Sequence, residues 1–192
     1  MLKEPIMQKL KKEYPAPEFE DRSADLMQSM IKSIISQQLS VKAASTIFGR
    51  FQDLFIANSF PTDKEILAMD DEIMRSAGLS YAKIKYVKSV ANAFVSDLID
   101  IKKIRKQSDE EVISELIQIH GIGRWTAEMI LIFSLQRPDI FSIDDLGIRN
   151  AITRLYGISD RKEMLELSEK WKPYRSTACW YLWRSLGNAP AA

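Results

Sequence analysis

Asp144 and Asp145 stand side by side after Phe141-Ser-Ile and directly before a helical pattern of apolar residues. A carboxylate can stabilise positive charge that develops in a transition state, and it can orient or deprotonate a water molecule. Carboxylates are also favoured at helix starts, where Ser142 or Asp144 would serve as the N-cap. Adjacent side chains at a helix start cannot face the same way, so we expect one carboxylate to cap the helix and the other to point into a cleft.

Earlier in the chain, Gly121 and Gly123 form a Gly-x-Gly turn between two helical patterns. Glycine tolerates positive φ and lets the backbone approach a ligand closely. Backbone N–H groups at the start of the next helix lack intrahelical partners and lie at the positive end of the helix dipole, so the turn suits a phosphate. On its own, the turn is also typical of a tight helical hairpin. His120, the only histidine, is interpreted as a turn residue rather than a catalyst.

The elements around these residues are predicted to be helices. Apolar residues recur at three- and four-residue spacing, strand-like alternation is poor, and Pro or Gly separates the apolar stripes. These stripes predict an all-α protein with helices near residues 26–35, 47–55, 84–98, 112–117, 127–135, 148–156 and 178–186.

Composition limits the alternatives. The chain has 192 residues, 46% of them hydrophobic, which is enough for one domain or two small lobes. No apolar run is long enough for a membrane span, and the first residues have no apolar signal region. The single cysteine excludes an intrachain disulfide or a multi-thiolate cluster. We expect an intracellular setting, in the cytoplasm or nucleoid, or in the nucleus if the source is eukaryotic.

The net charge of +1 argues against binding of nucleic acid by bulk electrostatics alone. Basic residues do gather locally, and both one basic face and ordinary solvated helix faces remain open. The local groups are Lys83, Lys85 and Lys88, then residues 102–106, and then Lys170, Lys172, Arg175 and Arg184.

Three strings together resemble one family. They are residues 116–127 around the Gly-x-Gly turn, Phe141-Ser-Ile-Asp-Asp-Leu146, and Trp171-Lys-Pro-Tyr-Arg-Ser176. In this order and spacing they resemble the helix-hairpin-helix (HhH-GPD) DNA glycosylase superfamily. The resemblance runs from about Met30 to Trp183, and it is greatest to the DNA-3-methyladenine glycosylase II group, which carries tryptophan after Gly-x-Gly-Arg. His120 departs from the pattern, because many members have proline there.

The resemblance implies an all-α fold of two helical lobes with a DNA-binding cleft between them. Residues from about 41 to 133 would form the middle lobe, and residues 1–40 would join 134–192 in the other. The N-terminal β-rich domain of some larger relatives is not expected here.

The resemblance also implies roles for particular residues. Asp145 would be the catalytic carboxylate and Asp144 its capping or structural neighbour. Gln38 would be the wedge that fills the gap left by an extruded base, although a plain polar helix end is the alternative. The implied base pocket is Trp125, Trp183 and Tyr174. The implied DNA-binding residues are Gln37, Gln38, Ser40, Gly121, Gly123, Arg124 and Thr126.

No cofactor is expected. In the family, hairpin carbonyls can hold an alkali-metal ion, and the matching oxygens here are those of Ile117, Ile119 and Ile122, which would hold Na⁺ or K⁺ as a minor structural feature. The expected partner is damaged double-stranded DNA, with no membrane association, and the protein is expected to act as a monomer.

The implied activity is that of a monofunctional DNA glycosylase, which flips alkylated purines of the 3-methyladenine or 7-methylguanine type and hydrolyses the N-glycosidic bond. Relatives that form a Schiff base carry a lysine where Trp125 stands, and tryptophan cannot supply that amine. A bifunctional glycosylase/lyase and a non-catalytic helix-hairpin-helix DNA-binding module remain the alternatives. The range of accepted bases is left open, because pocket width is a tertiary property.

Overall fold

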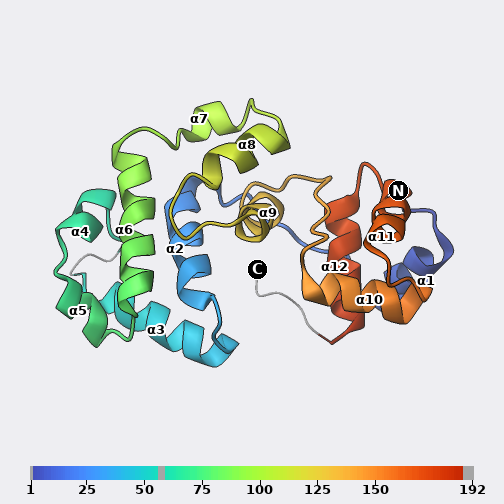
Figure 1. Ribbon diagram of the computed structural model, residues 1–192, viewed down its shortest axis with the longest axis horizontal. Coiled ribbons are helices and arrows are strands. Elements are labelled where there is room, and N and C mark those ends of the chain that lie inside the picture. Colours follow the sequence, from blue (N-terminus) through green and yellow to red (C-terminus); the bar gives the residue numbers. More distant parts are fainter. Residues whose placement is uncertain (1, 56–58, 188–192) are drawn as a thin grey trace. The chain divides into compact units, whose positions relative to one another are not determined.

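The computed structural model describes residues 2–55 and 59–187, and every regular element among them is helical (Figure 1). The all-α prediction is therefore confirmed. The α-helices are α1 (Pro5–Glu13), α2 (Leu26–Ser36), α3 (Val41–Asp53), α4 (Asp63–Ala68), α5 (Asp71–Ser76), α6 (Tyr81–Val95), α7 (Ile101–Ile104), α8 (Asp109–Leu116), α9 (Arg124–Phe133), α10 (Leu146–Tyr156), α11 (Arg161–Glu169) and α12 (Arg175–Ser185), with a 3-10 turn at Ser23–Asp25. No helix of the described ranges is both long and apolar enough to cross a membrane.

Most of these helices begin at a side chain that accepts hydrogen bonds from the first backbone N–H groups. Ser40, Ser80 and Asp100 cap α3, α6 and α7 in this way. Thr62 with Glu65 and Ser108 with Glu111 form complete capping boxes at α4 and α8. Short polar side chains at these positions satisfy amides that the helix itself leaves unpaired, so they set where each helix starts.

The chain divides into two compact units. One is formed by the described parts of Met1–Asp21 and Glu128–Ala192, and the other by Arg22–Ala127. We call them the discontinuous unit and the central unit. The boundaries differ from the expected lobes, because α2 packs against α3 and α6, and residues 22–40 therefore lie in the central unit. The second boundary falls within α9 instead of after it.

In the discontinuous unit, α1 and α10 both pack against α12. The first helix is held there by Met7 and Leu10, which are buried, so the N-terminal segment is part of the core of this unit. Trp171 is fully buried and lies against the rings of Phe141 and Tyr156. Trp171 is therefore a core residue of this unit.

Candidate functional site

Asp145 is the N-cap of α10. Its Oδ1 accepts the backbone N–H of Ile148 at 2.8 Å and the indole Nε1–H of Trp183, on α12, at 2.9 Å. Both bonds reach the same oxygen, so two donors from different helices fix the orientation of the carboxylate. Hydrogen bonds to an ionised carboxylate are stronger than neutral ones, and the start of a helix favours negative charge.

Asp144 does not cap the helix, contrary to the expectation for this pair. Its exposed carboxylate accepts a hydrogen bond from Nη2 of Arg161 at 2.7 Å. The reason is local geometry: the backbone of Asp145 is extended, with φ −70° and ψ 120°, which aims its own side chain back at the N–H of Ile148. The residue singled out for chemistry is therefore also the capping residue.

Gly147 makes room for the indole of Trp183. A Cβ atom built on Gly147 would lie 3.0 Å from Oδ1 of Asp145 and 3.2 Å from Cδ1 of Trp183. A Cβ contact this short is tighter than ordinary van der Waals contact, so a side chain here would press on both partners of the hydrogen bond. A glycine in the first turn of α10 thus permits the Asp145–Trp183 contact.

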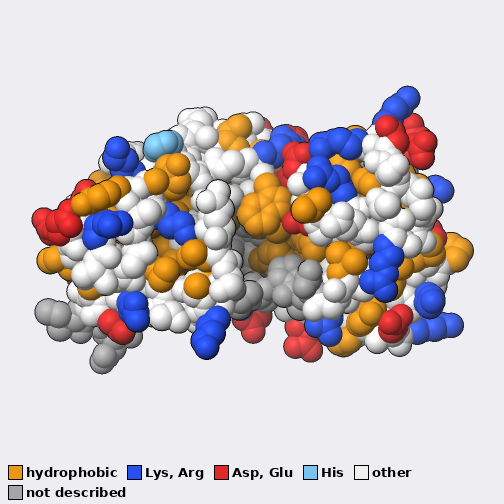
Figure 2. Space-filling model, turned by 60° about the horizontal axis from the view of Figure 1, so that its bottom comes forward, with side chains coloured by type: hydrophobic (Ala, Val, Ile, Leu, Met, Phe, Trp, Pro, Cys, Tyr) orange, Lys and Arg blue, Asp and Glu red, His pale blue; other side chains and the backbone are white. Residues whose placement is uncertain are grey.

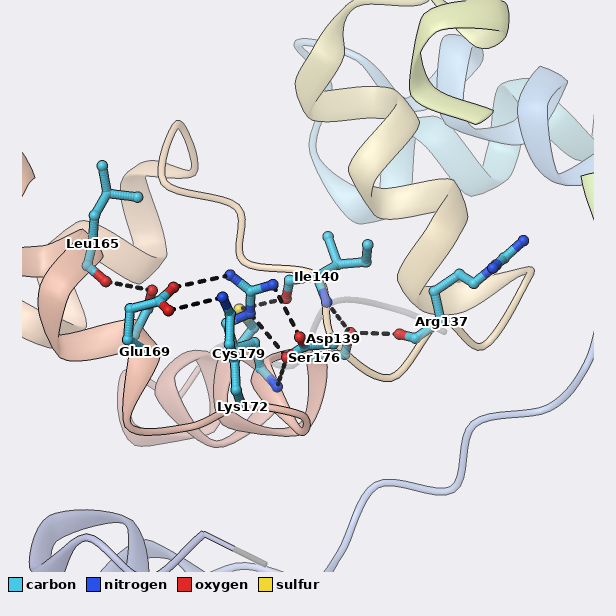
Figure 3. Close-up of polar contacts among 10 residues, drawn as sticks. Arg137, Asp139, Ile140, Leu165, Glu169, Lys172, Ser176 and Cys179 are labelled. Carbon is cyan, nitrogen blue, oxygen red and sulfur yellow. Dashed lines mark hydrogen bonds and ion pairs between the residues drawn. The ribbon is translucent and has the colours of Figure 1, made fainter. Parts of the chain in front are cut away.

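The segment that leads from α9 to α10 is tied to the start of α12 (Figure 3). Arg175 binds both carboxylate oxygens of Asp139, with Nε–Oδ1 at 2.9 Å and Nη2–Oδ2 at 3.0 Å. Ser176 Oγ donates to the carbonyl of Arg137 at 2.6 Å and accepts the N–H of Ile140 at 3.0 Å. Two neighbouring side chains therefore clamp the chain shortly before it reaches Asp145.

A buried pair continues this support. The Ser142 hydroxyl donates to Oε2 of Glu128 at 2.5 Å, and the two residues are 0% and 3% exposed. The carbonyl of Ser142 accepts the N–H of Asp145 at 3.1 Å. Sequence reasoning missed Glu128, Arg175 and Ser176 as supports of this turn. Arg175 and Ser176 end the Trp-Lys-Pro-Tyr-Arg-Ser string, but the sequence interpretation of that string used only its aromatic residues.

Of the three aromatic residues predicted for the base pocket, Trp183 donates a hydrogen bond to the Asp145 carboxylate. It is 4% exposed, and its ring centroid lies 5.7 Å from that of Phe133. Trp125 and Tyr174 are each 41% exposed, and Trp125 belongs to the central unit. Part of each of these two rings therefore faces solvent, whereas the indole of Trp183 is buried.

The Gly-x-Gly turn has the backbone that its glycines predict. Gly121 has φ 98°, and the ring of Tyr86 on α6 fills the space where a Cβ would lie. Gly123 is exposed, and no atom of residues 2–55 or 59–187 lies within 4 Å of a Cβ built on it. Its carbonyl accepts the first helical bond of α9 from Ala127 N at 2.9 Å. Glycine has no side chain with which to cap the first amides of α9.

Two other predicted DNA-binding residues lie in the first turn of α9. Arg124 is exposed and pairs with both carboxylate oxygens of Glu110, at 2.6 and 3.2 Å. Thr126 is 3% exposed and so faces the interior of the protein. A phosphate could draw Arg124 away from Glu110, because a solvent-exposed ion pair is worth little in water.

Gln37, Gln38 and Ser40 follow the end of α2. The Gln37 amide donates through Nε2 to the carbonyl of Gly121 at 3.2 Å, which links this segment to the Gly-x-Gly turn. Gln38 is exposed and has φ 59°, a backbone conformation that residues other than glycine rarely adopt. Ser40 accepts the N–H of Ala43 at 3.3 Å as the N-cap of α3.

Positive charge is dispersed on the face drawn in Figure 2. Lys and Arg side chains lie there at many separate places, with hydrophobic and neutral surface between them. Several basic side chains are also paired, including Lys88 with Asp71 at 2.6 Å and Lys103 with Glu115 at 2.5 Å. Local geometry at the turn therefore has to contribute more to an anion site than bulk charge does.

Comparison with known proteins agrees with the family to which the motifs point. Residues 31–174 match the HhH-GPD superfamily of base excision DNA repair proteins. The chain is 47% identical over 162 residues to DNA-3-methyladenine glycosylase 1 of Schizosaccharomyces pombe, with 82% of this chain and 71% of that protein covered. It is 33% identical over 165 residues to the putative DNA-3-methyladenine glycosylase YfjP of Bacillus subtilis, with 82% of this chain but only 58% of the relative covered.

A solved structure also matches nearly the whole chain. The Schizosaccharomyces pombe 3-methyladenine DNA glycosylase Mag1, in complex with abasic DNA, has a TM-score of 0.84 and 41% identity, over 99% of this chain and 95% of that one. The resemblance inferred from the three strings is confirmed.

Proposed function

This chain belongs to the HhH-GPD superfamily of base excision DNA repair proteins, and from that membership we propose that it is a monofunctional DNA glycosylase. It excises alkylated purines of the 3-methyladenine and 7-methylguanine type from damaged duplex DNA, as a monomer. The observation that carries this proposal is the Asp145 carboxylate, held through Oδ1 by Ile148 N and Trp183 Nε1.

The chemistry suits a single fixed carboxylate. Cleavage of an N-glycosidic bond builds positive charge on the deoxyribose, and a preoriented negative charge stabilises that charge without reorganising. The same carboxylate can orient the attacking water. An alkylated purine already carries positive charge, so it leaves without a dedicated acid, and exposed rings such as Trp125 and Tyr174 can attract it by cation–π interaction.

The DNA backbone is proposed to bind where α9 starts. One phosphate would accept hydrogen bonds from the backbone amides that follow Gly123, with Arg124 exchanging Glu110 for the phosphate. Such contacts position the protein on DNA without reading its sequence, which fits an enzyme that must find damage in any context. Gln37, Gln38 and Ser40 would then face the duplex where the base leaves.

An alkali-metal ion at the hairpin is part of the proposal as a minor structural feature. Its ligands would be the carbonyl oxygens of Ile117, Ile119 and Ile122. The Ile119 oxygen already accepts the N–H of Ile122 at 3.0 Å, but a carbonyl has two lone pairs and can also face a cation. Bound there, the ion would supply positive charge near the proposed phosphate.

The proposal is tested by measuring base release from methylated duplex DNA with the wild type and Asp145→Asn. Asparagine is as good an N-cap as aspartate, and its oxygen can still accept from Ile148 and Trp183, so the fold should be kept while the charge is lost. We expect release of 3-methyladenine or 7-methylguanine by the wild type, a loss of about 100-fold or more in the variant, and unchanged DNA binding. Binding by both proteins without release by either would favour a non-catalytic DNA-binding module.

A second test separates hydrolysis from lyase chemistry. Because Trp125 provides no amine, borohydride reduction during turnover should trap no covalent complex between the protein and DNA. A bifunctional relative run in parallel shows that the trapping works. A stable protein–DNA adduct with this chain would contradict the monofunctional assignment and call for a search for the reacting lysine.

A further inference from the structure

Lys83, near the start of α6, holds the end of α2. Its ammonium donates to the carbonyl of Ile35 at 2.6 Å and to that of Gln37 at 2.9 Å. The last carbonyls of a helix have no intrahelical partners and carry its negative dipole, so a cation placed there satisfies both needs. Burial lowers the pKa of the Lys83 ammonium, as expected for a cation partly withdrawn from water.

The carbonyl of Gln37 that Lys83 binds belongs to the segment proposed to enter the duplex. Gln37 also donates its side-chain amide to Gly121 O at 3.2 Å, and the next residue, Gln38, is held at φ 59°. A left-handed conformation is unfavourable at a residue other than glycine. It persists only where neighbouring contacts enforce it, and Lys83 supplies one such contact at the carbonyl of Gln37, beside a second at Ile35.

The same side of α6 supports the Gly-x-Gly turn. Tyr86, three residues after Lys83, fills the space above Gly121, and its ring lies edge-on to His120 at 4.8 Å between centroids. Ser89, three residues further, accepts the N–H of His120 through Oγ at 3.1 Å. Residues at this spacing share one side of a helix. Lys83, Tyr86 and Ser89 thus form one support, which we call the α6 platform.

We propose that the α6 platform holds the 37–40 segment in register with the phosphate-binding turn, and that Lys83 is a positioning residue for extrusion of the damaged base. The inference rests on the proposed function. Extruding a nucleotide from a duplex is unfavourable because its stacking and pairing are lost, and the protein must fill the gap. A segment that is already set in its bound shape loses less conformational entropy when it enters the DNA.

The first test uses Lys83→Met, which keeps the length of the side chain and removes its charge and its donors. Lys85→Met is the matched control, because Lys85 is exposed and lies two positions along α6, which turns its side chain away from that of Lys83. Single-turnover release of an alkylated purine is measured from a fully paired duplex and from a duplex in which that base is mispaired. We expect Lys83→Met to slow release about tenfold or more from the paired duplex and about threefold or less from the mispaired one, where extrusion is easier.

A second readout does not depend on cleavage. A duplex carrying 2-aminopurine beside a stable abasic analogue reports unstacking of the neighbouring base when the 37–40 segment enters. The wild type and Lys85→Met should raise the fluorescence on binding, and Lys83→Met should raise it much less at saturating protein. If the wild type raises the fluorescence but releases no alkylated base, the glycosylase proposal fails and the inference on Lys83 is still judged by this signal.

Two results would overturn the inference. One is wild-type behaviour of Lys83→Met in both assays. The other is an equal loss on paired and mispaired DNA, which would mark Lys83 as a general structural residue. If Lys83→Met is unfolded at the assay temperature, Lys83→Gln replaces it, since its amide can still donate to one carbonyl. The expected result is then a smaller defect with the same dependence on pairing, and a defect independent of pairing again contradicts the inference.

Discussion

The carboxylate of Asp145 serves the fold and the proposed chemistry at once. It caps α10 through Ile148 N, and it also accepts the indole N–H of Trp183. Replacement by alanine would remove a cap worth about 0.5–2 kcal/mol together with the charge, so loss of activity in that variant would have two causes. Replacement by asparagine separates the two causes, because it removes the charge but keeps the oxygen that both donors reach.

Gly147 tests whether the Trp183 contact matters for activity. In Gly147→Ala, the new methyl group would press on Oδ1 of Asp145 and on the indole, lengthening their hydrogen bond. A bond to a charged group contributes roughly 1.5–3 kcal/mol, so we expect kcat for base release to fall about tenfold or more. Alanine is the better helix former, so the melting temperature should fall little, if at all.

The matched control for this prediction is Gly49→Ala, on α3. A Cβ built on Gly49 meets no atom within 4 Å in the part of the chain that the structure describes, so this variant gains the same helix propensity without a steric conflict there. It should retain wild-type kcat. Full activity in Gly147→Ala would mean that the Asp145–Trp183 bond contributes nothing to the rate and that Trp183 serves the core alone.

The start of α9, in the hairpin that α8 and α9 form, differs from other helix starts in the residue that precedes it. Side chains cap α3, α6, α8 and α10, whereas α9 follows a glycine. The two positions of the turn require glycine for different physical reasons. Gly121 is required by its positive φ and by the ring of Tyr86, but no atom of the described residues crowds Gly123. A requirement at Gly123 would therefore come from a ligand.

Alanine substitutions at the two positions should separate these reasons. Gly121→Ala forces a side chain into a positive-φ position against Tyr86, at a cost of roughly 1–3 kcal/mol, so its melting temperature should fall by several degrees. Gly123→Ala should melt like the wild type but bind duplex DNA several-fold more weakly, because its methyl group would stand where a phosphate approaches. Thermal melts and DNA titrations at one fixed salt concentration measure both effects. Unchanged DNA affinity of Gly123→Ala would argue against phosphate binding at this turn.

Over the whole chain, the proposed chemistry and the proposed grip on DNA are divided between the two units. Asp145 and Trp183 belong to the discontinuous unit, and the 37–40 segment, the Gly-x-Gly turn and the α6 platform belong to the central unit. The helix α9 contributes to both, since the boundary falls within it. Substitutions in the central unit should therefore act on binding and base extrusion, and those around Asp145 on the cleavage step.

Much of this protein follows from local patterns in its sequence. The spacing of apolar residues predicts helices, since one face of each must be buried, and the glycines and prolines mark the interruptions. The three strings identify the family, because each occurs in the expected order. They also indicate Asp145 as the catalytic carboxylate and Trp183 as part of the base pocket. The structure places these two side chains in contact.

Other features depend on contacts between residues far apart in the chain, which no local pattern encodes. Asp145 rather than Asp144 caps α10 because of the backbone angles at the turn. Residues 22–40 join the central unit because α2 packs against α6. Lys83 looks like an ordinary surface lysine in the sequence, and only the folded chain brings its ammonium to the carbonyls of Ile35 and Gln37. Helix formation is governed by neighbours in sequence, whereas support of a functional segment is governed by neighbours in space.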